Sequence, residues 1–342
     1  MAWSLAHAKL HTFLRKRVLL PRNSHILMAV SGGQDSLCLA RLLLDMQHKW
    51  QWSLAIAHCD HRWREDSAEN AAYVVDLATQ WQIPCWVEVA DVAIESESAA
   101  RAWRYATFAR LARAAGYAYV VTGHTASDRA ETVLYNLIRG TGLEGIGTLP
   151  WQRPLDGLLP PVQLVRPLLA FSRKDTGDFC QTQQLHPWED SSNQDLKFRR
   201  NRIRQELLPY LKEHFNPQVE RSLSQMAETA AIDIQYIEEQ ASKIYSRVIT
   251  ETIQTDELTT SLSPTRRIWK IDCAKLKAEP LSLQHRVIRQ VLQRALPHPP
   301  NFQQVQKLVD LLNAPNGAQS DPYPGGLVAE VCKPFIQLTT LL

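Results

Sequence analysis

One hexapeptide, Ser31-Gly32-Gly33-Gln34-Asp35-Ser36, constrains this chain more than any other stretch. An apolar run of strand length, residues 26–30, precedes it, and a longer apolar run that fits a helix, residues 37–44, follows it. The paired glycines allow a sharp turn and let a ligand approach the backbone amides closely. Because those amides lie at the positive end of the helix dipole, the stretch predicts a site for an anionic group such as a phosphate.

The other residue types in this turn narrow the expected ligand. Ser31 and Ser36 can add hydroxyl donors, whereas Asp35 would stand beside the anion, where a bridging divalent cation is the natural partner for a carboxylate. The turn lacks the Gly-Lys-Ser/Thr of a Walker A loop and the third glycine of the dinucleotide fingerprint. An ordinary serine-glycine turn between a strand and a helix is the alternative interpretation.

The length of 342 residues exceeds that of one ordinary core and predicts two domains, residues 1–212 and 213–342, with Pro209 and Pro217 near the boundary. A net charge of +3 is too small to indicate nucleic-acid binding, so such a role must come from local clusters. Six cysteines without a Cys-x-x-Cys pair favour a reducing cytoplasm and argue against a zinc or iron–sulfur site. No apolar run is long enough to cross a membrane.

Strands and helices alternate through the first domain. After a helix over residues 2–20, we expect strands at residues 26–30, 54–58, 85–89 and 117–122, and helices from residue 37 and at residues 66–81, 97–115 and 126–139. This order predicts an α/β fold, with a parallel sheet covered by helices on both faces. Ligands of such sheets bind outside the carboxyl ends of the strands. The loops at residues 31–36, 58–64 and 123–128 should therefore face one crevice.

The remainder of the chain gives weaker signals. Residues 143–167 are rich in Gly and Pro and indicate an irregular loop. The second domain is expected to be mainly α-helical, with helices at residues 218–245, 281–296 and 302–313 and strands only within residues 327–342.

Arginines and carboxylates cluster on two of the expected helices. Arg101 and Arg104 share one face of the helix at 97–115, where they could clamp phosphates, and a solvated helix face is an equal alternative. Asp128 and Glu131 are three residues apart on the next helix, so together they could hold the ammonium group of an amino acid. A neutral His124 at the head of that helix could contact a transferring phosphate or relay a proton. For Asp128, the alternative is a capping box with Thr125.

A basic run closes the first domain. It mixes acidic residues and Asn with Lys197, Arg199, Arg200, Arg202 and Arg204 over residues 189–204. Such a cluster can neutralise phosphates of a nucleic acid or one anionic substrate. The alternative is an exposed ion-pair network that contributes little.

Taken together, these stretches resemble the tRNA(Ile)-lysidine synthase family of the PP-loop ATP pyrophosphatases. The matching stretches, in chain order, are residues 31–36, 58–64, 97–108, 123–132, 139–142, 166–169, 189–193 and 200–204. Two departures stand out: Arg62-Trp63 where Gly-Leu is usual, and Arg129 where glutamine is common. The hexapeptide alone would indicate only the superfamily, whereas the set of stretches indicates the family.

The resemblance implies an ATP-dependent ligase that works in two steps. ATP would adenylate the C2 carbonyl oxygen of the wobble cytidine in the CAU anticodon of tRNA(Ile). The ε-amine of lysine would then displace AMP and leave lysidine. The modified tRNA would read AUA instead of AUG and change its identity from methionine to isoleucine.

The resemblance also implies roles by position. Ser31, Gly32, Gly33, Gln34, Asp35 and Ser36 would hold ATP, and Asp35 would help to coordinate Mg²⁺. Arg104 would contact phosphate and His124 would act near the α-phosphate. Asp128 and Glu131 would bind lysine, whereas Arg200 and Arg204 would meet the nucleotide or the tRNA backbone.

Three other functions compete with this one. A tRNA thiolation enzyme of the same superfamily is the alternative within that class, although this chain lacks the paired cysteines that such enzymes usually carry. A non-catalytic RNA-binding protein with a degenerate loop, and an ATP-dependent amidotransferase, are the others. The sequence leaves the oligomeric state open, with a homodimer as one option.

Overall fold

The computed structural model describes residues 3–62, 66–91, 94, 96–188, 195–255 and 265–341. Trp63, Arg64 and the stretch at 189–193, which took part in the resemblance, lie outside these residues. The chain divides into two compact units, Met1–Ala231 and Ile232–Leu342. Helix α10 (Val219–Val248) contributes residues to both units, and the domain boundary near residue 212 stays a prediction.

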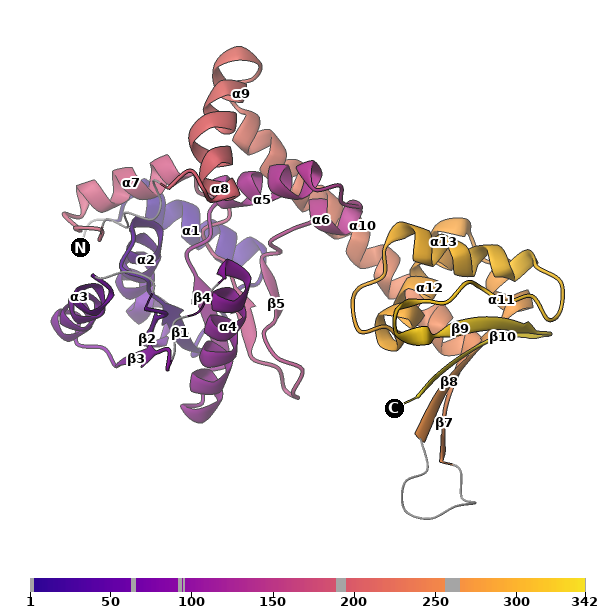
Figure 1. Ribbon diagram of the computed structural model, residues 1–342. Helices are drawn as coiled ribbons and strands as arrows, with labels where there is room; N and C mark the ends of the chain where they lie inside the picture. The colour runs from indigo at the N-terminus through magenta and orange to yellow at the C-terminus, as the bar shows by residue number, and fades with distance from the viewer. Residues whose placement is uncertain are drawn as a thin grey trace. The chain divides into compact units, whose positions relative to one another are not determined.

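Six strands form the sheet of the first unit, in the order β3-β2-β1-β4-β6-β5 (Figure 1). They are β1 (His25–Ala29), β2 (Ser53–Asp60), β3 (Cys85–Val89), β4 (Tyr119–Thr122), β5 (Gln152–Pro154) and β6 (Gln163–Val165). All neighbouring pairs are parallel except β5 with β6. The parallel sheet is confirmed. The expectation of an irregular loop at 143–167 was wrong, since it contains β5 and β6, strands of three residues that are too short for a recognisable period.

The helices of this unit follow the expected alternation. They are α1 (Leu5–Lys16), α2 (Gln34–Trp50), α3 (Ser67–Gln80), α4 (Glu97–Ala114), α5 (Ala126–Ile138), α6 (Leu143–Ile146), α7 (Arg173–Thr182), α8 (Arg199–Arg202) and α9 (Leu208–His214), with a π-helical turn at Ile203–Leu207. Helix α1 is shorter than expected. Val18 has a φ of 53° and is 79% exposed, so the predicted helix over residues 2–20 ends before it.

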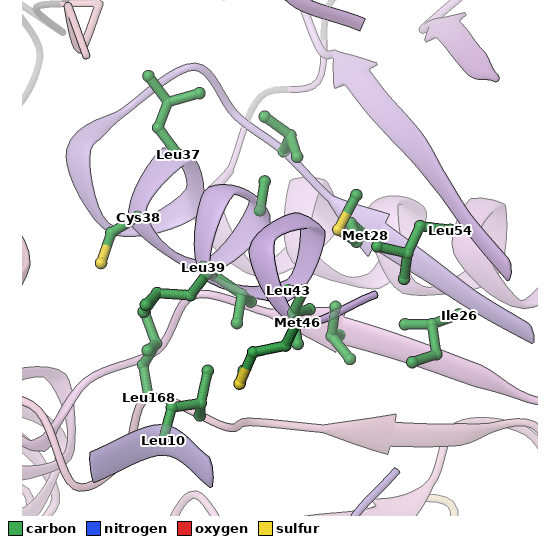
Figure 2. Packing of buried hydrophobic residues seen from close by; sticks show 14 of the residues in the cluster. Leu10, Ile26, Met28, Leu37, Cys38, Leu39, Leu43, Met46, Leu54 and Leu168 are labelled. Carbon is green, nitrogen blue, oxygen red and sulfur yellow. The ribbon is translucent and has the colours of Figure 1, made fainter. Parts of the chain in front are cut away.

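Alternate residues of each strand pack on opposite faces of the sheet, as the pleat requires. Ile26 and Met28 of β1 join a core built with α1, α2, α3 and α7, whereas Leu27 joins the core built with α4. Figure 2 shows the first of these cores, where Leu39, Leu43 and Met46 of α2 lie over the sheet. Helices therefore cover both faces, as predicted.

The second unit combines helices with an antiparallel sheet of order β7-β8-β10-β9. Its elements are β7 (Ile249–Thr255), β8 (Thr265–Asp272), α11 (Cys273–Lys277), α12 (Leu281–Ala295), α13 (Phe302–Asp310), 3₁₀ turns at Leu311–Asn313 and Pro324–Gly326, β9 (Val328–Cys332) and β10 (Phe335–Leu341). Its core gathers around the fully buried Trp269 of β8. The strands at the end of the chain are confirmed, but β7 and β8 were not predicted.

Among the described residues, none of the helices combines the length and the apolar character that a membrane span requires.

Candidate active site

The site lies where the strand order of the first sheet reverses. The chain passes from β1 to β2 on one side and later enters β4 on the other side of β1. The loops after β1 and β4 are therefore neighbours at a topological switch point, where such sheets bind ligands. Gly123, directly after β4, lies so close to the hexapeptide that an added Cβ would be 2.8 Å from the carbonyl carbon and oxygen of Asp35. The two loops form one surface because a glycine stands at this contact.

The hexapeptide forms the strand-to-helix turn that its sequence predicts. Gly32 has a φ of +86°, a conformation that residues with a Cβ rarely adopt. The side-chain amide of Asn70 donates to the carbonyl oxygen of Ser31 at 3.0 Å, and the Trp188 amide donates to the carbonyl oxygen of Gly32 at 2.9 Å. Ser36 accepts from the amide of Ser31 at 3.2 Å. Contacts from two other segments, together with one inside the hexapeptide, thus fix the turn whose helix begins at Gln34.

A cavity of about 740 Å³ opens over this turn. Its lining includes Ser31, Gly33, Gln34, Asp35, Ser36, His58, Cys59, Asp60, His61, Arg101, Arg104, Tyr105, Gly123, His124, Asp128, Arg173 and Arg204. Each of the three predicted loops therefore contributes residues to one crevice. Arg101 and Arg104 both line this cavity, so their helix face lies at the site, and a role in clamping phosphates stays a prediction.

Asp35 is held from a helix that the sequence analysis did not connect to the site. Thr176 of α7 donates a hydrogen bond to Asp35 Oδ1, and the guanidinium of Arg173 lies 3.8 Å from Oδ2. The side chain of Gln34 donates to the Arg173 carbonyl at 2.7 Å and so ties the two helices together. Burial, with a smaller contribution from Asp128, raises the pKa of Asp35. A cation beside this buried carboxylate would stabilise its charged form.

His124 presents a neutral imidazole to the cavity. Its Nδ1 lies 2.9 Å from the hydroxyl of Thr122. Burial first, and then the nearby Arg166 cation, lower the pKa of His124 to about 3. The ring is therefore uncharged near neutral pH and can exchange hydrogen bonds with an anion without adding charge.

Asp128 and Glu131 lie side by side on α5, and Asp128 also forms the capping box that was the alternative interpretation. Its Oδ2 accepts from the amide of Thr125 at 2.7 Å, which completes a capping box, and its Oδ1 lies 3.4 Å from Nη2 of Arg204. Arg204 also donates from Nε and Nη2 to the two oxygens of Glu131, at 2.6 and 2.8 Å. The carboxylate pair exists as predicted, but Arg204 contacts it directly, which sequence spacing could not reveal.

Arg200 and Arg204 line a second cavity of about 480 Å³. Arg200 forms an ion pair with Glu97 at 2.9 Å. Arg101 and Arg104 line both this cavity and the larger one, as do His124, Asp128 and Arg204. The two cavities therefore share a wall that carries both the cations and the carboxylates.

Sequence reasoning missed a group of cations around Tyr105. The guanidinium carbons of Arg101 and Arg153 lie 4.9 and 5.2 Å from the centre of its ring. The deeply buried Arg166 contributes a third positive charge to this group. Burial alone would raise the pKa of Tyr105, but Arg101 and Arg166 outweigh it and leave that pKa lowered. The stretch at 166–169 was noted only as part of the resemblance, without a role.

Within the described residues, no group of three or more His, Cys, Asp or Glu side chains is arranged to hold a metal ion. Asp35 nevertheless offers one carboxylate beside the amides of the glycine turn. That donor set fits Mg²⁺, which usually binds through one or two carboxylates together with substrate phosphates and water.

Two family models match parts of this chain. A PP-loop domain family, a class of ATP-binding domain, matches residues 4–211, and the TilS substrate binding domain matches residues 271–328. The tRNA(Ile)-lysidine synthase of Nostoc sp. (strain PCC 7120) is 50% identical, with 97% of this chain and 96% of the relative covered. That of Synechocystis sp. (strain PCC 6803) is 45% identical, with 98% of each covered.

A solved structure supports the fold independently. The U34-tRNA thiolase NcsA from Methanococcus maripaludis superposes with a TM-score of 0.56 at 16% identity, covering 66% of this chain and 78% of the thiolase. At that identity, the likeness concerns the fold alone. The match over nearly the full length of the bacterial relatives goes further, and the chain belongs to the tRNA(Ile)-lysidine synthase family.

Proposed function

We propose that this chain joins lysine to C2 of the wobble cytidine in the CAU anticodon of tRNA(Ile), while ATP is converted to AMP and pyrophosphate. The observation that carries the proposal is the single cavity in which the glycine turn, Asp35, Arg104, His124 and Asp128 meet. A triphosphate, a flipped-out base and an amino acid need to be neighbours for this reaction, and the membership of the family favours it.

The first step would use the groups around the glycine turn. The amides at the start of α2 and the hydroxyls of Ser31 and Ser36 would bind the triphosphate. Asp35 would hold Mg²⁺ together with the phosphates, and the ion supplies charge neutralisation for the departing pyrophosphate. Arg104 would bind a phosphate, and the neutral His124 would hydrogen-bond the α-phosphate as it passes to the C2 oxygen of cytidine.

The second step would use the carboxylates that line the smaller cavity. Asp128 and Glu131 would hold lysine by an ammonium group, because paired carboxylates suit a cation. The ε-amine then forms a bond to C2, the bond between C2 and oxygen breaks, and AMP leaves with that oxygen. Arg200 and Arg204 would contact the nucleotide or the tRNA backbone. The six free cysteines are consistent with a cytoplasmic setting.

The thiolation alternative finds little support in the cysteines of the cavity. Among the described residues that line the cavity, the one cysteine is Cys59. Burial raises the pKa of its thiol to about 12. A thiol that stays protonated near neutral pH is a poor nucleophile and a poor carrier of sulfur.

The test is to mix the full chain with ATP and a tRNA(Ile) transcript bearing CAU, with and without lysine. We expect pyrophosphate and AMP, and the transcript should gain the mass of a lysine residue only when lysine is present. An initiator tRNA(Met) transcript, which shares the anticodon, is the control and should remain unmodified. ATP cleavage that leaves both transcripts unmodified would contradict the proposal.

A further inference from the structure

Arg204 contacts the two carboxylates that the proposed function assigns to lysine. Its guanidinium lies on both oxygens of Glu131 and on Oδ1 of Asp128, while the backbone and hydroxyl of Thr125 contact Oδ2 of Asp128. All four carboxylate oxygens therefore have a hydrogen-bond donor from the protein. Resting on the proposed function, we propose that Arg204 is a gate: it closes the lysine pocket, and lysine enters when a phosphate draws the guanidinium away.

Arg204 occupies the carboxylate oxygens that a lysine ammonium would need. The carboxylate of Glu131 is 5% exposed, whereas the Arg204 side chain over it is 24% exposed. Both residues line the smaller cavity, and there the guanidinium already donates to both oxygens of Glu131. A two-pronged pair between arginine and carboxylate is a strong, geometrically specific contact. An incoming lysine has to replace it rather than add to it.

The backbone under Arg204 is suited to a change of side-chain position. Arg204 lies in the π-helical turn Ile203–Leu207, between α8 and α9. Such turns carry one extra residue relative to an α-helix and are frequent at functional sites. Its side chain also reaches the larger cavity, which the glycine turn lines. A phosphate bound there would be an alternative partner for the guanidinium, because it is negatively charged like a carboxylate and has a similar geometry.

The consequence is an order of binding. As long as Arg204 remains on Glu131, lysine meets a neutralised carboxylate, and its affinity is low. When a phosphate of the nucleotide or of the tRNA attracts Arg204, the two carboxylates become available to an ammonium. The gate would thereby delay lysine until the first step is prepared, and the two phosphate sources can be separated by experiment.

The experiment measures lysine binding to the full chain by calorimetry, for the natural protein and for Arg204→Gln. Without nucleotide, we expect Arg204→Gln to bind lysine about tenfold more tightly, because a charge-assisted competitor has been removed. Arg202→Gln is the matched control, since Arg202 lies in α8 and pairs with the exposed Glu206 at 3.4 Å. It should bind lysine like the natural protein.

Two further arms identify the phosphate. One adds an ATP analogue with a methylene group between the α- and β-phosphorus atoms, and the other adds the tRNA transcript alone. At least one should tighten lysine binding to the natural protein by about the same factor and leave Arg204→Gln unchanged. Lysine binding that is no tighter in Arg204→Gln, or an enhancement that persists in it, would overturn the gate.

The design separates the gate from the proposed function. If lysine binds the natural protein and Glu131→Gln abolishes that binding, the lysine site stands, whatever Arg204 does. If Glu131→Gln has no effect on lysine binding, the proposed lysine site fails first and the gate fails with it. Thermal unfolding of each variant checks folding. If Arg204→Gln does not fold, the natural protein alone still tests the gate. The gate is refuted if neither phosphate source raises the affinity of the natural protein for lysine.

Discussion

Asp35, which lines the larger cavity, and Glu131, which lines the smaller one, are neutralised in different ways. Asp35, at the glycine turn, accepts a hydroxyl donor from Thr176, and its nearest guanidinium, on Arg173, is 3.8 Å away. Glu131, on α5, accepts two close donors from Arg204, at 2.6 and 2.8 Å. Burial raises the pKa of both, and in each case nearby arginines oppose that effect.

The difference indicates what each carboxylate is suited to bind. Asp35 lacks a close two-pronged cation and lies beside amides that favour phosphate, so a metal ion between it and a phosphate would complete its neutralisation. Glu131 already has an organic cation of its own. A second organic cation, such as an ammonium, can take the place of the first without leaving the carboxylate buried and unpaired.

The two carboxylates should differ most clearly when each is replaced by its amide. We expect Asp35→Asn to lower the rate of tRNA-dependent pyrophosphate release by about 10³-fold, because it removes the charge that holds the metal ion at the reacting phosphates. Glu131→Gln should retain pyrophosphate release in the first turnover and fail mainly in the transfer to lysine. Quenched-flow measurements of pyrophosphate and of modified tRNA distinguish the two steps. If both variants lose the same step to the same extent, the two carboxylates do not have separate roles.

His124, which lines both cavities, provides a test by pH. Its folded-state pKa is about 3, below the ordinary value of 6.5, so the unfolded chain binds the proton first as the pH falls. The free energy of unfolding should therefore fall below pH 6.5, and His124→Asn should lack this part of the loss. Between pH 6.5 and 5, we expect the natural protein to lose about 1.6 kcal/mol more than the variant.

Urea titrations at each pH, followed by hydrogen exchange of the peptide that contains β4, would measure this free energy for the first unit. His298→Asn, which replaces an exposed histidine of the second unit, is the control and should leave the difference between the two pH values unchanged. If His124→Asn behaves like His298→Asn, the imidazole is not held neutral by its surroundings.

The sequence sufficed for the parts of the fold that repeat a pattern. Strands and helices alternate clearly in the first unit, and residues such as Gly32 and Gly123 mark the places where the backbone must turn or approach closely. It failed for β5, β6 and β7–β8, where strands are too short or their partners are distant in the chain. Pairing between β8 and β10 joins residues more than sixty positions apart, which local propensity does not encode.

The residues of the candidate site were also predictable only in part from the sequence. Asp35, Arg104, His124, Asp128 and Glu131 could be found because each follows a strand end or repeats along one helix face, and they do line the two cavities. The roles of Thr176 and Arg204 depend on contacts across 141 and 73 residues of sequence. No spacing rule reports such contacts, so the hydroxyl on Asp35 and the guanidinium on Glu131 emerged only from the structure.

The smallest expected effect concerns the hydroxyl that distinguishes the surroundings of Asp35. Thr176→Val keeps the shape of the side chain and removes its hydrogen bond to Asp35, so we expect pyrophosphate release to slow by about tenfold. Thr182→Val, on the exposed end of the same helix, removes a hydroxyl that donates only to the carbonyl of Asp178 and should leave the rate unchanged.

Because Thr176 also contacts the side chain of Gln34, Thr176→Val could act through that residue instead. Gln34→Ala, assayed alone and together with Thr176→Val, resolves this: if the losses of the single variants multiply, Thr176 acts on Asp35 directly, whereas a double variant no worse than Gln34→Ala means that the hydroxyl serves only to hold Gln34.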